Sequence, residues 1–259
     1  MNRALDLYYG NKNNLLSIYF TAGYPSMESI PEIISALQSS KVDLIEIGIP
    51  FSDPIADGGV IQHSAAHAIH NGFTLNQLFT ILESMKDHIT IPIYLMGYLN
   101  PIYKFGMDNY LKQCSEIGIS GSIIPDMPLD LYTGTYKSLF EEHDHIPMFL
   151  FSPNTTAKRL ERLVQLSPGF MYMVSSHAIT GEYLKKINVS TAYNRLNQKY
   201  KIKHKSLVGF GIRDAQTFQQ ACRIGRGGII GSAFIQHISE HGISEKSIQQ
   251  FINSIKDLQ

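Results

Sequence analysis

The sequence predicts an α/β protein folded as a single closed (β/α)8 barrel over residues 1–259. Eight short β-rich runs alternate with amphipathic helical stretches from one end of the chain to the other. Several of these runs are almost wholly apolar, which is typical of parallel strands covered by helices. The 259 residues match the ~250 that a barrel of this kind uses in one domain. A doubly wound open sheet is the structural alternative.

The order of the elements follows from where each β-rich run starts and where helical periodicity replaces it. Apolar residues recur at spacings of three and four in the stretches 30–37, 75–82, 107–114, 160–164 and 248–255, and Thr74 is a suitable N-cap for the second of these helices. We expect the strands to begin near Leu15, Asp43, Pro92, Gly121, Pro147, Phe170, Ser206 and Gly227.

Composition and charge exclude several function classes. The 22 basic and 22 acidic residues cancel, whereas a nucleic-acid-binding protein normally carries a positive excess. No apolar run approaches the ~18 residues of a membrane span, and the first residues do not resemble a secretion signal. Cys114 and Cys222 lie in helical stretches without disulfide-framework spacing. The sequence therefore predicts a cytoplasmic protein with no nucleic-acid or membrane partner.

The second predicted strand carries a carboxylate, Glu46, among alternating isoleucines. Ile45, Ile47 and Ile49 occupy one face, which we expect to pack against helices, so that Glu46 points into the barrel near the carboxyl end of the strand. A carboxyl group in apolar surroundings is costly to ionise, and its pKa should rise toward a value useful for acid–base catalysis. An ion pair with a buried cation is the alternative, although the neighbouring strand segments contain no Lys or Arg.

The long loop after this strand offers a second carboxylate, Asp57. Gly58 and Gly59 should make the loop mobile, while Pro54 stiffens its start. Asp-Gly pairs are also ordinary turn formers. Combined with Glu46, however, the loop could bring Asp57 over a site whose first carboxylate is fixed on the barrel.

Glycines at the ends of the last two strands suggest a phosphate site. Residues 209–211 read Gly-Phe-Gly and residues 231–232 read Gly-Ser. Glycine lets backbone N–H groups approach an anion, and a helix starting after Ser232 would direct its N-terminus at the same place. Barrels commonly hold phosphate between these two loops, although tight turns also use glycine.

Three histidines, His63, His67 and His70, fall on one helix face. Imidazoles at such spacing can ligate a metal, but no carboxylate partner accompanies them and no HEXXH motif is present. We therefore expect a solvated or partly packed helix face, and no metal site.

Longer motifs resemble the tryptophan synthase alpha subunit family along nearly the whole chain. The most specific is LIEIGIPFSDPIADGGVIQ (residues 44–62), which contains both carboxylates. The others are FTAGYP (20–25), YLNPIYKFG (98–106), PDMP (125–128), MVSSHAITG (173–181), GFGI (209–212) and GSA (231–233). The resemblance implies a TIM barrel that acts as a carbon–carbon lyase in tryptophan biosynthesis, cleaving indole-3-glycerol phosphate into indole and glyceraldehyde 3-phosphate.

The resemblance also assigns roles to residues of this sequence. Glu46 would be the general acid and base, and Asp57 the partner of the indole N–H. The remaining substrate contacts implied are Tyr19, Ile61, Tyr98, Tyr172 and Phe210 around the indole, Gly181, Gly211, Gly231 and Ser232 around the phosphate, and Thr180 as a further substrate contact. The family further implies no cofactor in this subunit, and an α2β2 heterotetramer with a beta subunit that binds pyridoxal phosphate and receives the indole.

Three segments depart from the usual family pattern. Gly59 replaces a proline, which should loosen the Asp57 loop; residues 176–178 read Ser-His-Ala where many members have Arg-Ala-Gly; and Arg226 precedes the last strand where an aspartate is common. Two alternative functions remain: a different phosphate-binding barrel, such as a sugar-phosphate isomerase or epimerase, and a subunit that only activates its beta partner. The presence of both carboxylates favours the lyase.

Overall fold

The computed structural model describes residues 2–55, 57–152, 154–174, 197–209 and 211–256. Its strands form one parallel sheet in the order β5-β4-β3-β2-β1-β9-β8-β7-β6. The strands are β1 (Leu15–Thr21), β2 (Leu44–Gly48), β3 (Ile93–Met96), β4 (Gly121–Ile123), β5 (Ile146–Pro147), β6 (Leu150–Phe151), β7 (Met171–Val174), β8 (Ser206–Gly209) and β9 (Gly227–Ile230).

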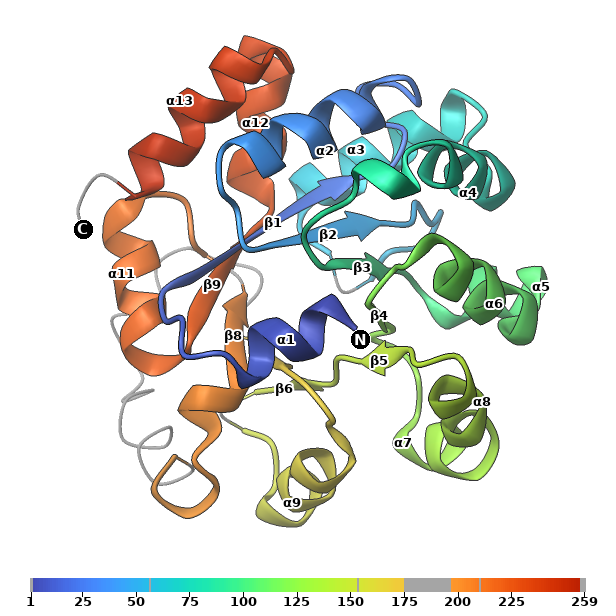
Figure 1. Ribbon diagram of the computed structural model, residues 1–259, viewed down its shortest axis with the longest axis vertical. Helices are drawn as coiled ribbons and strands as arrows, with labels where there is room; N and C mark the ends of the chain where they lie inside the picture. Colours follow the sequence, from blue (N-terminus) through green and yellow to red (C-terminus); the bar gives the residue numbers. More distant parts are fainter. Residues whose placement is uncertain (1, 56, 153, 175–196, 210, 257–259) are drawn as a thin grey trace.

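The sheet closes into a barrel because β5 and β6 are two halves of one strand. β5 pairs with β4, β6 pairs with β7, and only Met148 and Phe149 separate the halves. These two residues continue the backbone ladder: Met148 N donates to the Ser122 carbonyl and Tyr172 N to the Phe149 carbonyl, each at 2.9 Å. The nine segments therefore form the eight strands expected, arranged as a ring in Figure 1, and the predicted barrel is confirmed.

Helices surround this ring, as the apolar periodicity predicts. The Thr74 hydroxyl accepts a hydrogen bond from Gln77 N at 3.2 Å, which confirms it as a helix N-cap. The main helices are α1 (Arg3–Tyr9), α2 (Ser29–Ser39), α3 (Gly59–His70), α4 (Leu75–Ser84), α5 (Leu99–Phe105), α6 (Met107–Ile117), α8 (Lys137–Glu142), α9 (Ala157–Leu166), α11 (Ala215–Ile224), α12 (Ser232–His241) and α13 (Glu245–Lys256). Short helical turns lie at α7 (Leu129–Leu131), η1 (Lys86–His88), η2 (Tyr132–Tyr136) and η4 (Ile202–Lys205).

Helix α1 lies across the amino end of the barrel (Figure 1). Asn2 caps the helix and donates from Nδ2 to the Ser120 carbonyl, just before β4, at 2.8 Å. Arg3 donates to the Gly118 carbonyl at 3.0 Å. The helix thereby shields the barrel interior from water at this end, and the opposite, carboxyl end is left for the site.

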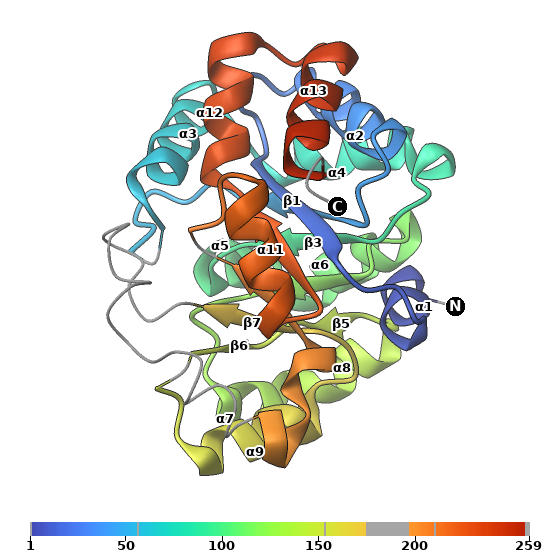
Figure 2. The ribbon, with the colours of Figure 1, turned by 90° about the vertical axis from the view of Figure 1, so that its left-hand side faces the viewer.

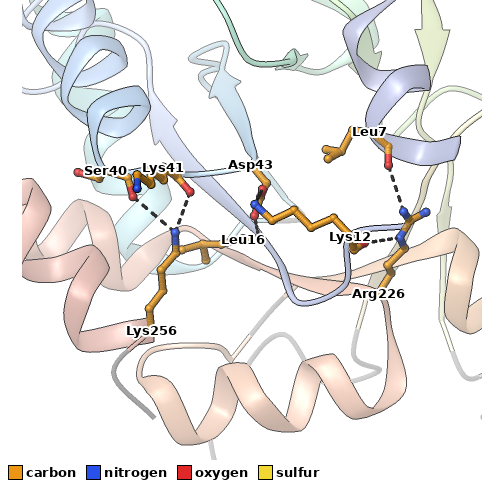
Figure 3. Close-up of polar contacts among 8 residues, drawn as sticks. All are labelled: Leu7, Lys12, Leu16, Ser40, Lys41, Asp43, Arg226 and Lys256. Atoms are coloured by element: carbon orange, nitrogen blue, oxygen red, sulfur yellow. Dashed lines mark hydrogen bonds and ion pairs between the residues drawn. The ribbon is translucent and has the colours of Figure 1, made fainter. Parts of the chain in front are cut away.

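Polar contacts at the same amino end tie distant parts of the chain together (Figure 3). Arg226, immediately before β9, donates to the carbonyls of four residues at the end of α1 and just after it: Leu7, Tyr8, Gly10 and Lys12. The Asp43 carboxylate accepts from Leu16 N at 3.0 Å and forms an ion pair with Lys12. Arg226 thus satisfies carbonyls that a helix end leaves without partners.

The C-terminal helices complete the outer layer. Figure 2 shows α12 and α13 beside α2 and α3, and α13 packs directly on α2. Lys256, the last residue of α13, donates to the Lys41 carbonyl at 2.7 Å, as Figure 3 shows. None of the helices in the described ranges is long and apolar enough to cross a membrane.

Candidate active site

Glu46 lies inside the barrel, as its place in the alternating strand predicts. Its side chain is fully buried, and Oε1 accepts a hydrogen bond of 2.9 Å from the Ser17 hydroxyl on the neighbouring strand β1. The second oxygen, Oε2, is also buried and has no hydrogen-bond partner within the described ranges. The alternating isoleucines Ile45, Ile47 and Ile49 are buried in the core.

The surroundings of Glu46 favour its neutral form. Burial removes the carboxylate from water and raises its pKa to about 8, and the Ser17 hydrogen bond opposes only part of this effect. Among the ion pairs of the described residues, none involves Glu46. The group is therefore mostly protonated at neutral pH, while its pKa remains close enough to 7 for it to give up and regain a proton.

Asp57 lies in the loop between β2 and α3, where backbone contacts hold the loop in place. Asp57 N donates to the Pro54 carbonyl at 3.0 Å, and Gln62 Nε2 on α3 donates to the Asp57 carbonyl at 2.9 Å. The Tyr98 hydroxyl, at the start of α5, donates to Asp57 Oδ2 at 3.5 Å. Asp57 is thus anchored from α3 and contacted from the end of the third barrel strand.

The two carboxyl groups differ in protonation. Burial raises the pKa of Asp57 to about 6, and the Tyr98 hydrogen bond lowers it again in part. At neutral pH Asp57 is therefore mostly ionised, whereas Glu46 is mostly protonated. Paired carboxyls whose environments separate their pKa values are a common arrangement for acid and base roles in one site.

Tyr19 lies beside both carboxyl groups. Burial raises its pKa, and the negative charges of Asp57 and Glu46 raise it further. Its ring fills the space next to Gly48: a Cβ added at Gly48 would lie 2.0 Å from the Tyr19 hydroxyl oxygen. On the other side, a Cβ at Gly231 would lie 3.2 Å from the same ring. Tyr19, on β1, therefore lies between the ends of its two neighbouring strands, β2 and β9.

Tyr172 on β7 packs against Gly209 of the neighbouring strand β8, just as Tyr19 packs against Gly48 of β2. Burial raises its pKa, followed by the charge of Glu46. A Cβ added at Gly209 would lie 2.1 Å from the Tyr172 hydroxyl oxygen, so the glycine at the end of β8 makes room for this ring. Tyr19, Tyr98 and Tyr172 thus lie around the two carboxyl groups.

Three of the predicted phosphate residues, Gly211, Gly231 and Ser232, lie after the ends of β8 and β9. Gly231 and Ser232 are half-buried, and Ser232 is the first residue of the ten-residue helix α12. Gly211 is exposed and has a φ of +76°, a conformation that favours glycine. Backbone N–H groups at a helix N-terminus are suited to an anion, and Ser232 stands at such a terminus.

The remaining predicted contacts divide into two groups. Ile61 is half-buried on α3, near the anchored Asp57 loop, and packs against the core. Thr180, Gly181 and Phe210 lie outside the described residues, as does the Ser-His-Ala segment 176–178.

Gly59, the departure from the family pattern in the Asp57 loop, is the first residue of α3, where proline is also well tolerated.

The histidine face of α3 is engaged in local contacts. His67 Nε2 lies 3.1 Å from the Pro25 carbonyl and 3.0 Å from Asn71 Nδ2, while His63 and His70 are exposed. Across the described part of the chain, no three His, Cys, Asp or Glu side chains are grouped to hold a metal ion.

Two residues at the site were not predicted from the sequence. Ser17 bonds Glu46, and Gly48 admits the Tyr19 ring. Both signals are present in the sequence: Ser17 interrupts an apolar strand on the face that carries Tyr19, and Gly48 shares the face of Glu46. The alternation of the strands could have indicated Ser17, but the fit of Gly48 to Tyr19 depends on the register between β1 and β2, in which Tyr19 pairs with Glu46.

Comparison with known proteins identifies the family to which the chain belongs. The family model described as "Tryptophan synthase alpha chain" matches residues 6–259. The tryptophan synthase alpha chain of Flavobacterium johnsoniae is 44% identical over 256 residues, which cover 99% of this chain and 100% of the relative. Among solved structures, the tryptophan synthase A-subunit of Pyrococcus furiosus is similar with a TM-score of 0.83 and 32% identity, covering 95% of this chain and 99% of the other.

A further solved structure is a tryptophan synthase complex from Pyrococcus furiosus, whose matching chain has a TM-score of 0.82 and 32% identity, covering 95% of this chain and 99% of the other. The family model spans the strands that carry Glu46 and Tyr172, and each structural match covers 95% of this chain. The chain belongs to the tryptophan synthase alpha chain family.

Proposed function

We propose that Glu46 and Asp57 carry out the reaction of this family, the cleavage of indole-3-glycerol phosphate into indole and glyceraldehyde 3-phosphate. The observation that supports this assignment is the placement of the buried Glu46 and the half-buried Asp57 at the barrel mouth, where burial raises their pKa values to about 8 and about 6. One group is protonated at neutral pH and the other is ionised, which are the two states that the reaction needs at its start.

In the proposed mechanism, protonated Glu46 donates its proton to C3 of the indole ring. This converts the ring into a cationic leaving group. The Glu46 carboxylate then takes the proton of the hydroxyl on the adjacent side-chain carbon, a carbonyl forms there, and the bond from that carbon to C3 breaks. Its electron pair returns to the ring, which releases neutral indole and restores protonated Glu46. Proton transfers of this kind each contribute ~10²–10⁴-fold to the rate.

Asp57 is assigned to the ring nitrogen. Positive charge develops on the indole N–H when C3 is protonated, and an ionised carboxylate beside it stabilises that charge mainly in the transition state. Tyr98 supports this role, because its hydroxyl contacts Asp57 Oδ2 at 3.5 Å. We assign the indole pocket to Tyr19, Ile61, Tyr98, Tyr172 and Phe210.

The phosphate of the substrate is assigned to the opposite edge of the mouth. The half-buried Gly231 and Ser232 at the start of α12, together with the positive φ of Gly211, support backbone N–H binding there. Gly181 completes the proposed cradle by resemblance, and Thr180 is a further proposed substrate contact. A Gly211 substitution by a bulky residue should weaken binding of glyceraldehyde 3-phosphate, and unchanged affinity would contradict this assignment.

The proposed partner is a tryptophan synthase beta subunit in an α2β2 assembly in the cytoplasm. The beta subunit would hold pyridoxal phosphate, and the alpha chain itself would use no cofactor. The test is indole release from indole-3-glycerol phosphate by the purified chain, with and without the beta subunit. Release by the chain that increases with the partner is expected. Beta-subunit activation without any indole release would instead indicate a purely activating subunit.

A further inference from the structure

Ser17 is the candidate for an additional role at this site. Its side chain is fully buried on the face of β1 that is directed into the barrel. The Ser17 hydroxyl donates a hydrogen bond of 2.9 Å to Glu46 Oε1. In the sheet register Ser17 pairs with Leu44, two residues before Glu46 on β2. The hydroxyl therefore reaches diagonally toward the carboxyl end of the neighbouring strand, where the carboxyl group lies.

The bond is selective between the two carboxyl oxygens. Oε1 accepts from Ser17, while Oε2 is buried without a hydrogen-bond partner within the described residues. A buried oxygen left unbonded costs free energy unless a ligand engages it. An accepting Oε1 can keep the Ser17 bond whether Glu46 is charged or neutral, because the proton of the neutral form can reside on Oε2.

We propose that Ser17 is a positioning residue for Glu46: its hydroxyl holds Oε1 in place and leaves Oε2 as the oxygen that gives and takes the proton. The inference rests on the proposed function of Glu46. It adds that the two oxygens have different roles, and that a residue outside the family motifs quoted above fixes which is which. Without the hydroxyl, the carboxyl group could rotate within the barrel, and its reacting oxygen would be less well directed at the substrate.

The other titratable groups around Glu46 do not titrate in the same pH range as Glu46. Tyr19 on β1, Tyr94 on β3 and Tyr172 on β7 all have pKa values raised by burial, so they remain neutral through the working range. Asp57 has its pKa raised to about 6, below that of Glu46. The upper titration step of the site therefore reports on Glu46.

The experiment compares Ser17→Ala, Ser17→Thr and a matched control, Ser206→Ala. Ser206 is also a fully buried serine on a barrel strand, and its hydroxyl donates to the Ile202 carbonyl at 2.8 Å, away from the carboxyl groups. For Ser17→Ala we expect a kcat for indole release about tenfold lower, with little change in KM. Its pH profile should shift upward by about one pH unit, because the lost hydrogen bond favoured the charged carboxylate.

Ser17→Thr, which keeps the hydroxyl, should recover most of the rate and the original profile, and Ser206→Ala should retain both. A Ser17→Ala variant with the wild-type rate and pH profile would overturn the proposal, as would equal losses in Ser17→Ala and Ser206→Ala. Circular dichroism establishes that each variant is folded. If Ser17→Ala does not fold, Ser17→Cys replaces it, because a thiol is a weaker hydrogen-bond donor. Ser17→Cys should shift the pH profile of indole release in the same direction.

A second readout does not depend on lyase activity. In protein carrying ¹³C at the glutamate side-chain carboxyl, the Glu46 signal is assigned by its absence in Glu46→Gln. Its titration midpoint should be higher in Ser17→Ala than in the unmodified chain. An unchanged midpoint would contradict the role of Ser17 even if the lyase reaction is confirmed. A chain that releases no indole but shows the shift would instead contradict only the proposed function.

Discussion

The Tyr19 hydroxyl lies where a side chain on residue 48 would have to be: a Cβ added at Gly48 would be 2.0 Å from the Tyr19 oxygen. Gly48 is the last residue of β2, two residues after Glu46, and Tyr19 pairs with Glu46 in the sheet. The glycine thus makes room for the aromatic ring against the end of β2, two residues beyond Glu46. The position of Tyr19 and the shape of the pocket depend on the absence of one side chain.

Gly48→Ala should therefore displace Tyr19. We expect a loss of about 1–3 kcal/mol in the free energy of unfolding, because the added methyl overpacks the barrel mouth, and a markedly lower rate of indole release. Gly134→Ala is the control, because a Cβ there meets nothing within 4 Å. Urea unfolding and indole assays on both variants test this. Similar values for Gly48→Ala and Gly134→Ala would show that the ring can move without cost.

Glu46 should make the stability of the fold depend on pH. Its folded-state pKa of about 8 lies above the ordinary value of 4.5, so the folded chain binds more protons than the unfolded chain between these values. Stability contributed by neutral Glu46 is fully present below pH 4.5 and is lost as the pH rises through 8. Relative to Glu46→Gln, the Tm of the unmodified chain should fall by several degrees over this window.

Asp57 also has a raised pKa, but both the unmodified chain and Glu46→Gln contain it. Its contribution to the pH dependence of Tm therefore cancels to first order in the comparison. A difference in Tm that stays constant from pH 4.5 to 8 would mean that Glu46 titrates normally. In that case the buried carboxyl could not be the proton donor at neutral pH.

Tyr98→Phe tests the contact that supports Asp57. The Tyr98 hydroxyl lowers the pKa of Asp57 by donating to Oδ2, so its removal should raise that pKa and leave less of the group ionised near neutral pH. Indole release should fall several-fold at pH 6 and less at pH 8. A loss that is equal at both pH values would place the effect of Tyr98 in packing, through its ring contact with Phe51, rather than in the charge of Asp57.

Arg226 should matter for stability but not for chemistry. Its guanidinium satisfies four carbonyls at and after the end of α1, at the amino end of the barrel and away from the carboxyl groups. We expect Arg226→Ala to lower the free energy of unfolding by about 2–4 kcal/mol with kcat nearly unchanged. Arg226→Lys should recover only part of the loss, because an ammonium cannot reproduce the planar fork. A large fall in kcat in a folded Arg226 variant would contradict this separation.

The sequence was sufficient to predict the barrel and the placement of Glu46, because strand alternation and helical periodicity are local signals. Alternation in residues 43–50 directs Glu46 inward, and the structure confirms this. The split of the fifth strand into β5 and β6 was not predicted, because it depends on separate pairing with β4 and β7. The carbonyl contacts of Arg226 span more than 200 residues of sequence, and no local pattern could indicate them.

The candidate site also combines features that the sequence predicts with features that depend on the packing of neighbouring strands. The family resemblance indicated Tyr19, Tyr98 and Tyr172, but the glycines that admit two of these rings are explained only by the packing of neighbouring strands. The Gly-Phe-Gly motif predicts a phosphate loop that begins at Gly209, whereas in the structure Gly209 makes room for Tyr172. The Ser17 bond likewise needs the register between β1 and β2.

The most direct test of the catalytic assignment is a single-turnover measurement of indole formation by Glu46→Gln in the presence of the beta subunit. Glutamine keeps the size and the acceptor for Ser17 but cannot give or take the proton. Indole formation should fall by at least ~10²-fold, while glyceraldehyde 3-phosphate binds with unchanged affinity. Folded Glu46→Gln protein that forms indole at a rate close to that of the unmodified chain would contradict the assignment of Glu46 as the acid and base.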